Sequence, residues 1–334
     1  MSDDLVTAII PTFNYGRFVT QAVDSALAQS YRNLEIMVVD DGSDDDTREQ
    51  LAPYGERIRY LYQKNQSVAA ARNTGIRAAT GNLIAFLDAD DIWHPQKIEL
   101  QMRCLANHPE AGIVAVDRLP EGAVSWPMLN GSTHLKARSI TVDELVLRPL
   151  FAPSGVLVRK QCFEVAGYFD PEFRNAEDYD MWIRIASHFP IVKLEIPLWW
   201  YRVHGSNKSH IPARQEAAAL KVLDKTFAKS SPLRNRFLLR QKAYSYAAYA
   251  AAQNFTSVGR ELPASMRILR SVLLWPLPYR RQEVATSLAR PKKLLIALLR
   301  MLRLMPRAAP RISANPPNLP QPSPHREAVQ KSTM

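Results

Sequence analysis

The stretches LEIMVVDD (residues 34–41) and LIAFLDADD (residues 83–91) decide the fold class of this chain. Each is a short apolar run, rich in β-branched residues, that ends abruptly in aspartates. Such runs are typical of buried strands in a parallel sheet. Because ligands of open α/β sheets bind outside the carboxyl ends of the strands, we expect these aspartates at a ligand-binding rim.

The aspartates at this rim predict a divalent cation. Carboxylates that crowd together raise one another's pKa unless a positive charge neutralises them. The Asp-Ala-Asp sequence at residues 88–90 supplies the oxygen ligands that Mg²⁺ or Mn²⁺ prefers. We therefore expect Mn²⁺ or Mg²⁺ at this position, together with a diphosphate.

Strands and helices alternate around these two runs through about residue 110, a pattern that predicts an α/β fold with a doubly wound, mostly parallel, Rossmann-like sheet. Strands are expected at residues 6–11, 34–40, 58–63 and 83–87, and helices at residues 18–28, 68–79 and 96–107, with a short helix that ends at residue 51.

The pattern becomes less regular after residue 112. Strands are expected at 113–116, 155–159 and 198–204, helices at 142–147, 160–166 and 178–188, and an inserted loop or hairpin at 119–138. Beyond residue 209 the chain is Ala-rich and predicted to be helical. These features predict three parts: a first domain (1–210), a helical basic region (211–305) and a disordered, Pro-rich tail (306–334).

The net charge of +11 is distributed unevenly along the chain. Residues 1–210 contain 21 Lys and Arg against 27 Asp and Glu, whereas residues 211–334 contain 22 Lys and Arg against 5 Asp and Glu. A strongly basic C-terminal third indicates a polyanionic partner, either nucleic acid or anionic lipid.

The two cysteines, Cys104 and Cys162, provide no disulfide framework and are expected to be buried, inert thiols in a reducing compartment. The acidic N-terminus lacks the basic segment of a secretory signal, and no run approaches the ~18 apolar residues of a membrane span. These observations predict a cytoplasmic protein, peripheral at the inner face of the cell membrane if the basic region binds lipid.

Six segments follow one another in a family-specific order: IIPTFN (9–14), VDDGS (39–43), ARNTGI (71–76), FLDADD (86–91), EDYDMWIR (177–184) and YRVH (201–204). In this order and spacing they resemble family 2 glycosyltransferases, which have the GT-A fold. The resemblance covers about residues 5–208 of the sequence.

This resemblance implies a metal-dependent, inverting transfer of a sugar from a UDP- or dTDP-sugar to a hydroxyl of a glycan or lipid-linked acceptor, in cell-surface polysaccharide assembly. Two alternatives remain open from the residues alone. One is a nucleotidyltransferase-like enzyme, which also uses carboxylate-bound metal. The other is a basic nucleic-acid-binding protein, although the chain lacks a zinc-ligand spacing and an aromatic–basic RNA motif.

The resemblance implies a metal site at the Asp-Ala-Asp sequence. Asp90 is expected to ligate the metal directly, and Asp88 to lie near the ribose or to reach the metal through water. Asp91 is expected to orient the loop that follows. His204, after the last strand, either ligates the metal or serves as a structural hydrogen-bonding residue.

The donor is expected to contact four further residues. A carboxylate only accepts hydrogen bonds, so Asp41 suits the N3–H of uracil or thymine. The alternative is a strand-terminating turn, for which Asp-Gly-Ser supplies the residues. Pro11 and Phe13 are expected to line the base pocket. Arg72 either pairs with the diphosphate or is a solvated helix arginine.

Asp178 is the predicted general base, which takes the proton of the acceptor hydroxyl. Glu177 is expected to position the acceptor or the base. The alternative for this pair is helix capping, with a favourable interaction with the helix dipole.

The segment KKLLIALLRMLRLMPR (292–307) has basic residues on one helical face and leucines on the other, which predicts peripheral contact with an anionic membrane. The alternative is a helix that packs on the catalytic domain. Trp199 and Trp200 are expected either to stack on a sugar or to pack in the core.

Overall fold

The computed structural model describes residues 4–120, 123, 125–127, 129, 135–204, 211–279, 290, 292, 295, 296 and 299. The strands are β1 (Val6–Thr12), β2 (Leu34–Asp40), β3 (Arg59–Tyr62), β4 (Leu83–Phe86), β5 (Ile92–Trp93), β6 (Ile113–Arg118), β7 (Ala137–Ile140), β8 (Val156–Arg159) and β9 (Ile191–Trp200). The helices are α1 (Gly16–Leu27), α2 (Thr47–Leu51), α3 (Val68–Ala78), α4 (Lys97–Asn107), α5 (Val142–Leu147), α6 (Gln161–Ala166), α7 (Glu177–Ala186), α8 (Pro212–Thr226), α9 (Phe237–Ser257) and α10 (Glu261–Leu274), with 3-10 turns at Ala52–Arg57 and Pro153–Gly155.

The strands form one mixed sheet in the order β3-β2-β1-β4-β8-β6-β9-β5, and β7 pairs with β9. The half made of β3, β2, β1 and β4 is parallel throughout, which confirms the predicted parallel core. In the other half, β8 runs antiparallel to β4 and β6, and β5 and β7 run antiparallel to β9. Because β2 and β4 flank β1 on opposite sides, the carboxyl ends of these three strands form the crevice where such sheets bind ligands.

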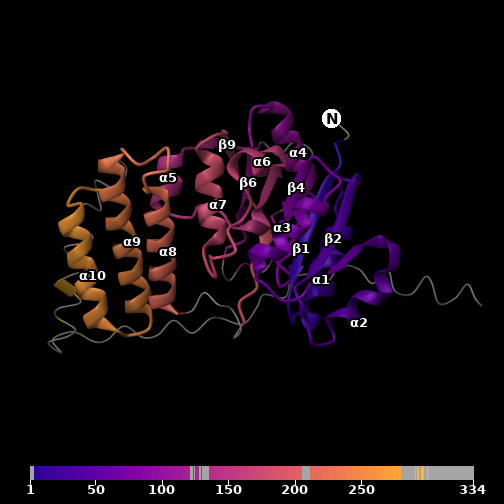
Figure 1. Cartoon of the computed structure of the whole chain (residues 1–334), viewed down its shortest axis with the longest axis horizontal. Helices are drawn as coiled ribbons and strands as arrows, with labels where there is room; N and C mark the ends of the chain where they lie inside the picture. The colour runs from indigo at the N-terminus through magenta and orange to yellow at the C-terminus, as the bar shows by residue number, and fades with distance from the viewer. Residues whose placement is uncertain are drawn as a thin grey trace, which may run out of the picture.

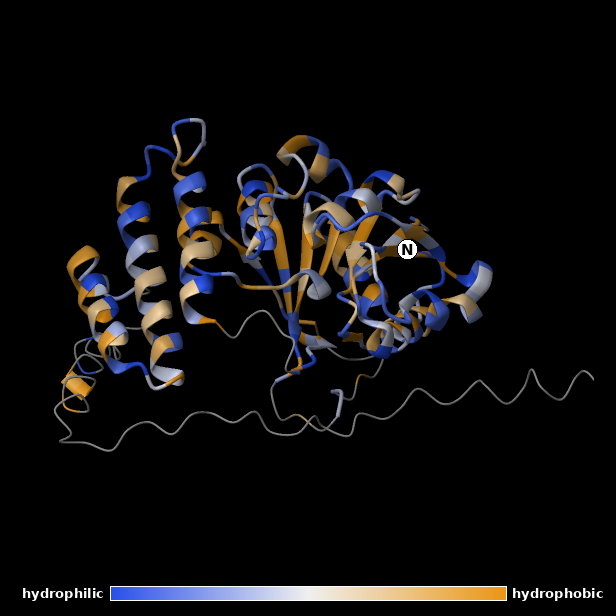
Figure 2. Ribbon diagram, turned by 60° about the horizontal axis from the view of Figure 1, so that its bottom comes forward, coloured by the Kyte–Doolittle hydropathy of each residue, from blue (hydrophilic) through white to orange (hydrophobic). Residues whose placement is uncertain are grey.

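Helices cover both faces of the sheet, as the alternation along β1 requires (Figure 1). Ile10 packs in the same core cluster as Val19 and Val23 of α1, whereas Ile9 packs in the cluster that contains α3. A Cβ atom on Gly75 would lie 2.5 Å from Cγ2 of Ile9, so glycine at this position lets α3 lie directly on β1. Hydrophobic residues recur along the strands between these layers (Figure 2).

The C-terminal region is helical, as the sequence predicted. Helices α8, α9 and α10 pack in series, starting from α7, and extend away from the sheet (Figure 1). The apolar core that contains α7 continues into this region through Val222, Leu223 and Phe227. The predicted tail, residues 306–334, lies outside the described residues.

The predicted final strand at 198–204 is confirmed at residues 198–200, but both of its bounds are wrong. Strand β9 begins at Ile191 and ends at Trp200, because the chain then leaves the sheet, and the backbone N–H of Arg202 donates instead to Oδ1 of Asp91. The two-residue strand β5, which pairs with the end of β9, was not predicted, since two residues carry no periodic signal.

Both cysteines are free and buried, as expected. Burial raises the pKa of Cys104 to about 11 and that of Cys162 to about 12, so both remain protonated thiols at neutral pH. No helix in the described part of the chain combines the length and hydropathy that a bilayer-crossing segment needs.

Candidate active site

Ser154 holds the loop that carries Asp88, Asp90 and Asp91 through two hydrogen bonds. The backbone N–H of Asp88 donates to Oγ of Ser154 (3.1 Å), and the Ser154 hydroxyl donates to Oδ2 of Asp91 (2.5 Å). Asp91 is buried, and burial together with the charges of Asp90 and Asp88 raises its pKa well above the usual range. These contacts hold the loop that carries the aspartates and leave the side chains of Asp88 and Asp90 at the rim. The expected role of Asp91 for the loop that follows stays a prediction.

Arg72 joins this loop to the start of α7. Its Nη2 donates to Oδ1 of Asp88 (2.7 Å), and its Nη1 donates to Oε1 of Glu177 (2.6 Å). The side chain is 3% exposed, so the alternative of a solvated helix arginine is wrong. The two carboxylates raise the pKa of Arg72 despite its burial, and the guanidinium therefore stays charged. One buried cation thus connects two carboxylates that are far apart in the sequence.

Asp178 follows Glu177 in the first turn of α7. Burial, with the neighbouring charge of Glu177, raises the pKa of Asp178 to about 7. Arg72 and the backbone N–H of Tyr179, which donates to Oδ1 of Asp178 (2.8 Å), act in the opposite direction. A carboxyl that titrates near neutral pH can accept a proton from an alcohol when it is ionised and can then release that proton to solvent.

Asp90 contacts His204, with 2.9 Å between Oδ2 and Nε2. The imidazole packs beside two aromatic rings, with its centroid 5.7 Å from that of Tyr15 and 4.9 Å from that of Phe18. Burial and the charge of Asp88 raise the pKa of Asp90. The pair places a carboxylate oxygen and an imidazole nitrogen side by side at the rim.

Asp41 lies at the other side of β1, at the end of β2. It is buried, and its Oδ1 accepts hydrogen bonds from Nε2 of Gln63 (2.6 Å) and from the backbone N–H of Gln66 (3.0 Å). Burial raises its pKa. Pro11 is buried within β1, next to β2, whereas Phe13 is exposed just beyond the strand. The four residues expected to meet the donor therefore come from β1 and the residue just beyond it, from the end of β2, and from α3.

Two site residues escaped the sequence analysis. Ser154 belongs to the short Pro-Ser-Gly turn before β8 and has no local pattern around it. Arg202 lies in the YRVH segment, in which only His204 was predicted to have a role. Its Nε donates to the backbone oxygen of Asp90 (3.0 Å), and its guanidinium lies over the rings of Phe18 and Trp200. Its place in that segment was the one available signal.

The two adjacent tryptophans belong to the interior. Trp199 and Trp200 are 4% and 7% exposed, and they pair with β5. This position supports the core-packing alternative over a sugar-stacking wall.

Removal of the Ser154 hydroxyl is expected to loosen the aspartate loop. In Ser154→Ala, the buried Asp91 loses a donor and the Asp88 N–H loses its acceptor, so we expect the free energy of unfolding to fall by about 1.5–3 kcal/mol. Urea unfolding at pH 7 measures this change. Ser187→Ala is the matched control, since its hydroxyl donates to a carbonyl within α7. Equal losses in both variants would refute a special role for Ser154.

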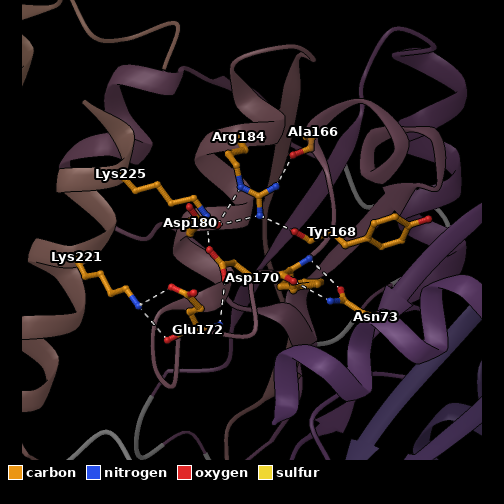
Figure 3. A network of polar contacts seen from close by, with 10 residues as sticks. Asn73, Ala166, Tyr168, Asp170, Glu172, Asp180, Arg184, Lys221 and Lys225 are labelled. Atoms are coloured by element: carbon orange, nitrogen blue, oxygen red, sulfur yellow. Dashed lines mark hydrogen bonds and ion pairs between the residues drawn. The ribbon is translucent and has the colours of Figure 1, made fainter. Parts of the chain in front are cut away.

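A network of polar contacts joins α7 to α8 and to the segment that precedes α7 (Figure 3). Lys225 of α8 contacts Asp170 (2.7 Å) and the buried Asp180 of α7 (3.2 Å), and Arg184 also binds Asp180 (2.9 Å). Next to Arg72, the side chain of Asn73 accepts from the N–H of Phe169 (2.9 Å) and donates to its carbonyl oxygen (2.7 Å). Helix α8 therefore supports the helix that carries Glu177 and Asp178.

The network predicts a pH-dependent contribution to stability. Burial opposes ionisation of Asp170, but the hydrogen bond from Lys225 lowers its pKa overall. A carboxyl with a lowered folded-state pKa stabilises the fold above its unfolded pKa of about 3.9, and this contribution is lost as the pH falls further. For the partly exposed Lys225, we expect Lys225→Met to cost about 1–2 kcal/mol at pH 7 and less below about pH 4.

Urea unfolding at both pH values tests this expectation. Lys221→Met, one helical turn earlier, is the control, because Lys221 pairs with the exposed Glu172 at 3.8 Å. Such exposed pairs contribute little. A loss for Lys225→Met that did not depend on pH would contradict the ionic explanation.

The chain is similar in sequence to known glycosyltransferases. A sequence profile described as Glycosyl transferase family 2 matches residues 7–155. An uncharacterized glycosyltransferase of Nostoc sp. is 30% identical over 309 residues, which cover 85% of this chain and 93% of that protein. The chain belongs to glycosyltransferase family 2.

Other similarities of this family 2 chain are partial or structural. An uncharacterized glycosyltransferase of Rickettsia prowazekii is 31% identical over 184 residues, and the match spans 54% of this chain and 58% of that relative. Residues 1–349 of S. aureus TarS in complex with UDP-GlcNAc match with a TM-score of 0.61 at 14% identity, over 88% of this chain and 89% of that one.

The mannosyltransferase PcManGT from Pyrobaculum calidifontis, in complex with GDP-Man and Mn²⁺, matches with a TM-score of 0.58 at 18% identity, over 90% of this chain and 87% of that one. At such identities the similarities establish the fold. The expected GT-A fold is confirmed for this family 2 chain.

Proposed function

We propose that this chain transfers a sugar from a nucleoside diphosphate donor to a hydroxyl group, with inversion at the anomeric carbon. The observation that carries the proposal is the bridge from Asp88 through Arg72 to Glu177, with Asp178 beside it. This bridge connects the rim of the parallel strands, where a donor would lie, with a carboxyl whose pKa is about 7. Family membership supports the same chemistry.

On the donor side, we assign Asp41 to the base, with Pro11 and Phe13 around it, and Asp88 to the ribose. Since Arg72 is 3% exposed and already binds two carboxylates, we assign it first to holding Asp88 and Glu177. Nε of Arg72 is buried without a hydrogen-bond partner in the structure, so direct pairing with a phosphate oxygen would use this N–H and keep both carboxylate contacts. Both arrangements place its positive charge near the leaving group.

We propose that Asp90 and His204 hold the divalent metal. In the part of the chain that the structure describes, no three His, Cys, Asp or Glu side chains gather closely enough to hold a metal by themselves. The pair nevertheless fits a divalent cation, because the Asp90 carboxylate suits Mn²⁺ or Mg²⁺ and Nε2 of the His204 imidazole, a ligand of transition metals, lies 2.9 Å from its Oδ2. Diphosphate oxygens would complete the site. A bound divalent cation would supply Lewis-acid stabilisation of the departing diphosphate.

On the acceptor side, we propose that Asp178 takes the proton of the attacking hydroxyl. Inversion requires attack from the face opposite the leaving group, so the base and the diphosphate must flank the sugar. The ion pair with Arg72 fixes Glu177, the residue before Asp178. Glu177 therefore acts by positioning this end of α7.

Product analysis tests the proposed reaction. The protein is incubated with UDP-, dTDP- and GDP-sugars, with Mn²⁺ and with EDTA, and the released nucleotide is identified. We expect a nucleoside diphosphate, formed only with metal. UDP- and dTDP-sugars are the proposed donors. Release of pyrophosphate from UTP or dTTP in a parallel incubation with a sugar 1-phosphate would instead support the nucleotidyltransferase alternative. Metal-independent release of the nucleoside diphosphate would overturn the metal assignment.

We also propose a glycan or lipid-linked acceptor in cell-surface polysaccharide assembly, with cytoplasmic residues 292–307 on an anionic membrane. The structure describes only 292, 295, 296 and 299 of this segment, so the predicted face lies mostly outside the described residues. The full-length variant with Lys293→Glu, Arg300→Glu and Arg303→Glu tests it. We expect weaker cosedimentation with phosphatidylglycerol-containing vesicles. Unchanged binding would contradict the assignment.

A further inference from the structure

Helix α10 has one buried face and one exposed apolar face. Its buried face packs on α9 through Ala264, Ser265, Ile268 and Ser271. On the opposite face, four large apolar side chains follow at spacings of four, three and four residues, which places them in a single row on a helix of 3.6 residues per turn. This outer ridge consists of Leu262, Met266, Leu269 and Leu273, which are 57%, 63%, 48% and 75% exposed.

The outer ridge lies at the end of the molecule remote from the sheet. Because α8, α9 and α10 pack in series, α10 is the outermost of the three helices (Figure 1). Hydrophobic residues recur along this helix in Figure 2. Leu277, which follows the helix, is 59% exposed and lengthens the apolar surface. A contiguous row of this kind on a water-exposed helix indicates a binding surface.

The net positive charge of the helical region that carries the outer ridge selects the class of partner. Residues 211–279 contain 11 Lys and Arg against 3 Asp and Glu, and Arg260 and Arg270 are exposed on α10 or at its start. Two such positive surfaces repel each other, which disfavours a second copy of this chain. Nucleic acid is held mainly by cations on phosphates and offers little to a row of leucines. An anionic bilayer offers acyl chains to the apolar row and negatively charged headgroups to the cations.

We infer that the outer ridge of α10 is a membrane-docking surface, which inserts Leu262, Met266, Leu269 and Leu273 at the headgroup boundary of an anionic bilayer. The inference rests on the membrane contact proposed above and assigns it to a different, fully described set of residues. Helix α10 lies in the interface plane, and the flanking cations meet the lipid phosphates.

Vesicle cosedimentation of the full-length protein tests this inference. The double variant Leu269→Ser/Leu273→Ser removes two exposed leucines without touching the buried face of α10. The matched control is Val165→Ser/Ile211→Ser, which removes two exposed apolar side chains outside the ridge. With vesicles of phosphatidylcholine and phosphatidylglycerol, we expect the α10 variant to bind at least about tenfold more weakly and the control to bind like wild type.

The outcomes separate the ridge inference from the proposal for residues 292–307. If the α10 variant binds like wild type while the charge variant of residues 292–307 does not, the ridge inference is overturned and the segment proposal stands. If wild type fails to bind anionic vesicles, both are overturned. If the α10 variant changes only the sedimentation coefficient, from dimer to monomer, the ridge is a contact between copies and the inference fails. Thermal unfolding of both variants confirms that each is folded.

Discussion

Replacement of Asp178 by asparagine is expected to lower turnover by about 10²–10⁴-fold while the affinity for the nucleotide-sugar stays near that of wild type. The amide has nearly the same shape but cannot accept the hydroxyl proton. Donor binding is spared because Asp88, Asp90 and Asp41 are untouched. Turnover from nucleoside diphosphate release and donor affinity from calorimetry separate the two quantities.

The pH profile provides a second measurement of the same assignment. Since the pKa of Asp178 is about 7, kcat/KM of wild type should fall as the pH decreases below this value, because the base becomes protonated. The variant should lack this limb. Glu172→Gln, in the exposed loop before α7, is the control and should keep both turnover and profile. Near-normal turnover of the asparagine variant would move the base to another residue.

Asp90→Ala should abolish the increase in donor affinity that Mn²⁺ provides. Loss of a second-sphere partner of a metal costs 10–100-fold in affinity, so loss of a direct ligand should cost at least about 100-fold. Thermal-shift titration of a UDP-sugar, with and without Mn²⁺, measures this effect without turnover. His204→Ala should show the same defect, because both side chains are assigned to one ion.

Asp44→Ala is the matched control for Asp90→Ala. Asp44 is an exposed carboxylate at the same rim, beyond β2. It should retain the full metal effect. Metal stimulation that persisted in Asp90→Ala would count against the ligand assignment, whereas its loss in Asp44→Ala as well would indicate a general effect of rim charge.

The parallel half of the sheet was predictable because β1, β2 and β4 are separate apolar runs with a turn signal after each, whereas β3 (Arg59–Tyr62) alternates only weakly. The same logic placed Asp41, Asp88 and Asp90 at one edge, since carboxyl ends of parallel strands meet. The antiparallel half was harder. A strand of two residues such as β5 has no periodicity, and the residue that contacts Asp91 beyond the end of β9, Arg202, carries no local signal of that contact.

The links between the site residues were not predictable from local pattern. Arg72 and Glu177 are 105 positions apart, and Ser154 lies 63 positions from Asp91. Periodicity and turn chemistry report on neighbours in the sequence and carry no information on which distant loop returns to the rim. The motifs therefore identify the candidate side chains, whereas the hydrogen bonds that link them are visible only in the structure.

The contact of Lys225 with Asp170 and Asp180 constrains how the two regions of this chain can diverge. The helix that presents Glu177 and Asp178 rests on a cation from α8 and on the apolar residues Val222 and Leu223. Substitutions in the C-terminal helices therefore change the packing and the charge around α7, and so the position of Glu177 and Asp178. An exchange of C-terminal helices between relatives would need to carry matching carboxylates in the first region, so the two regions must evolve together.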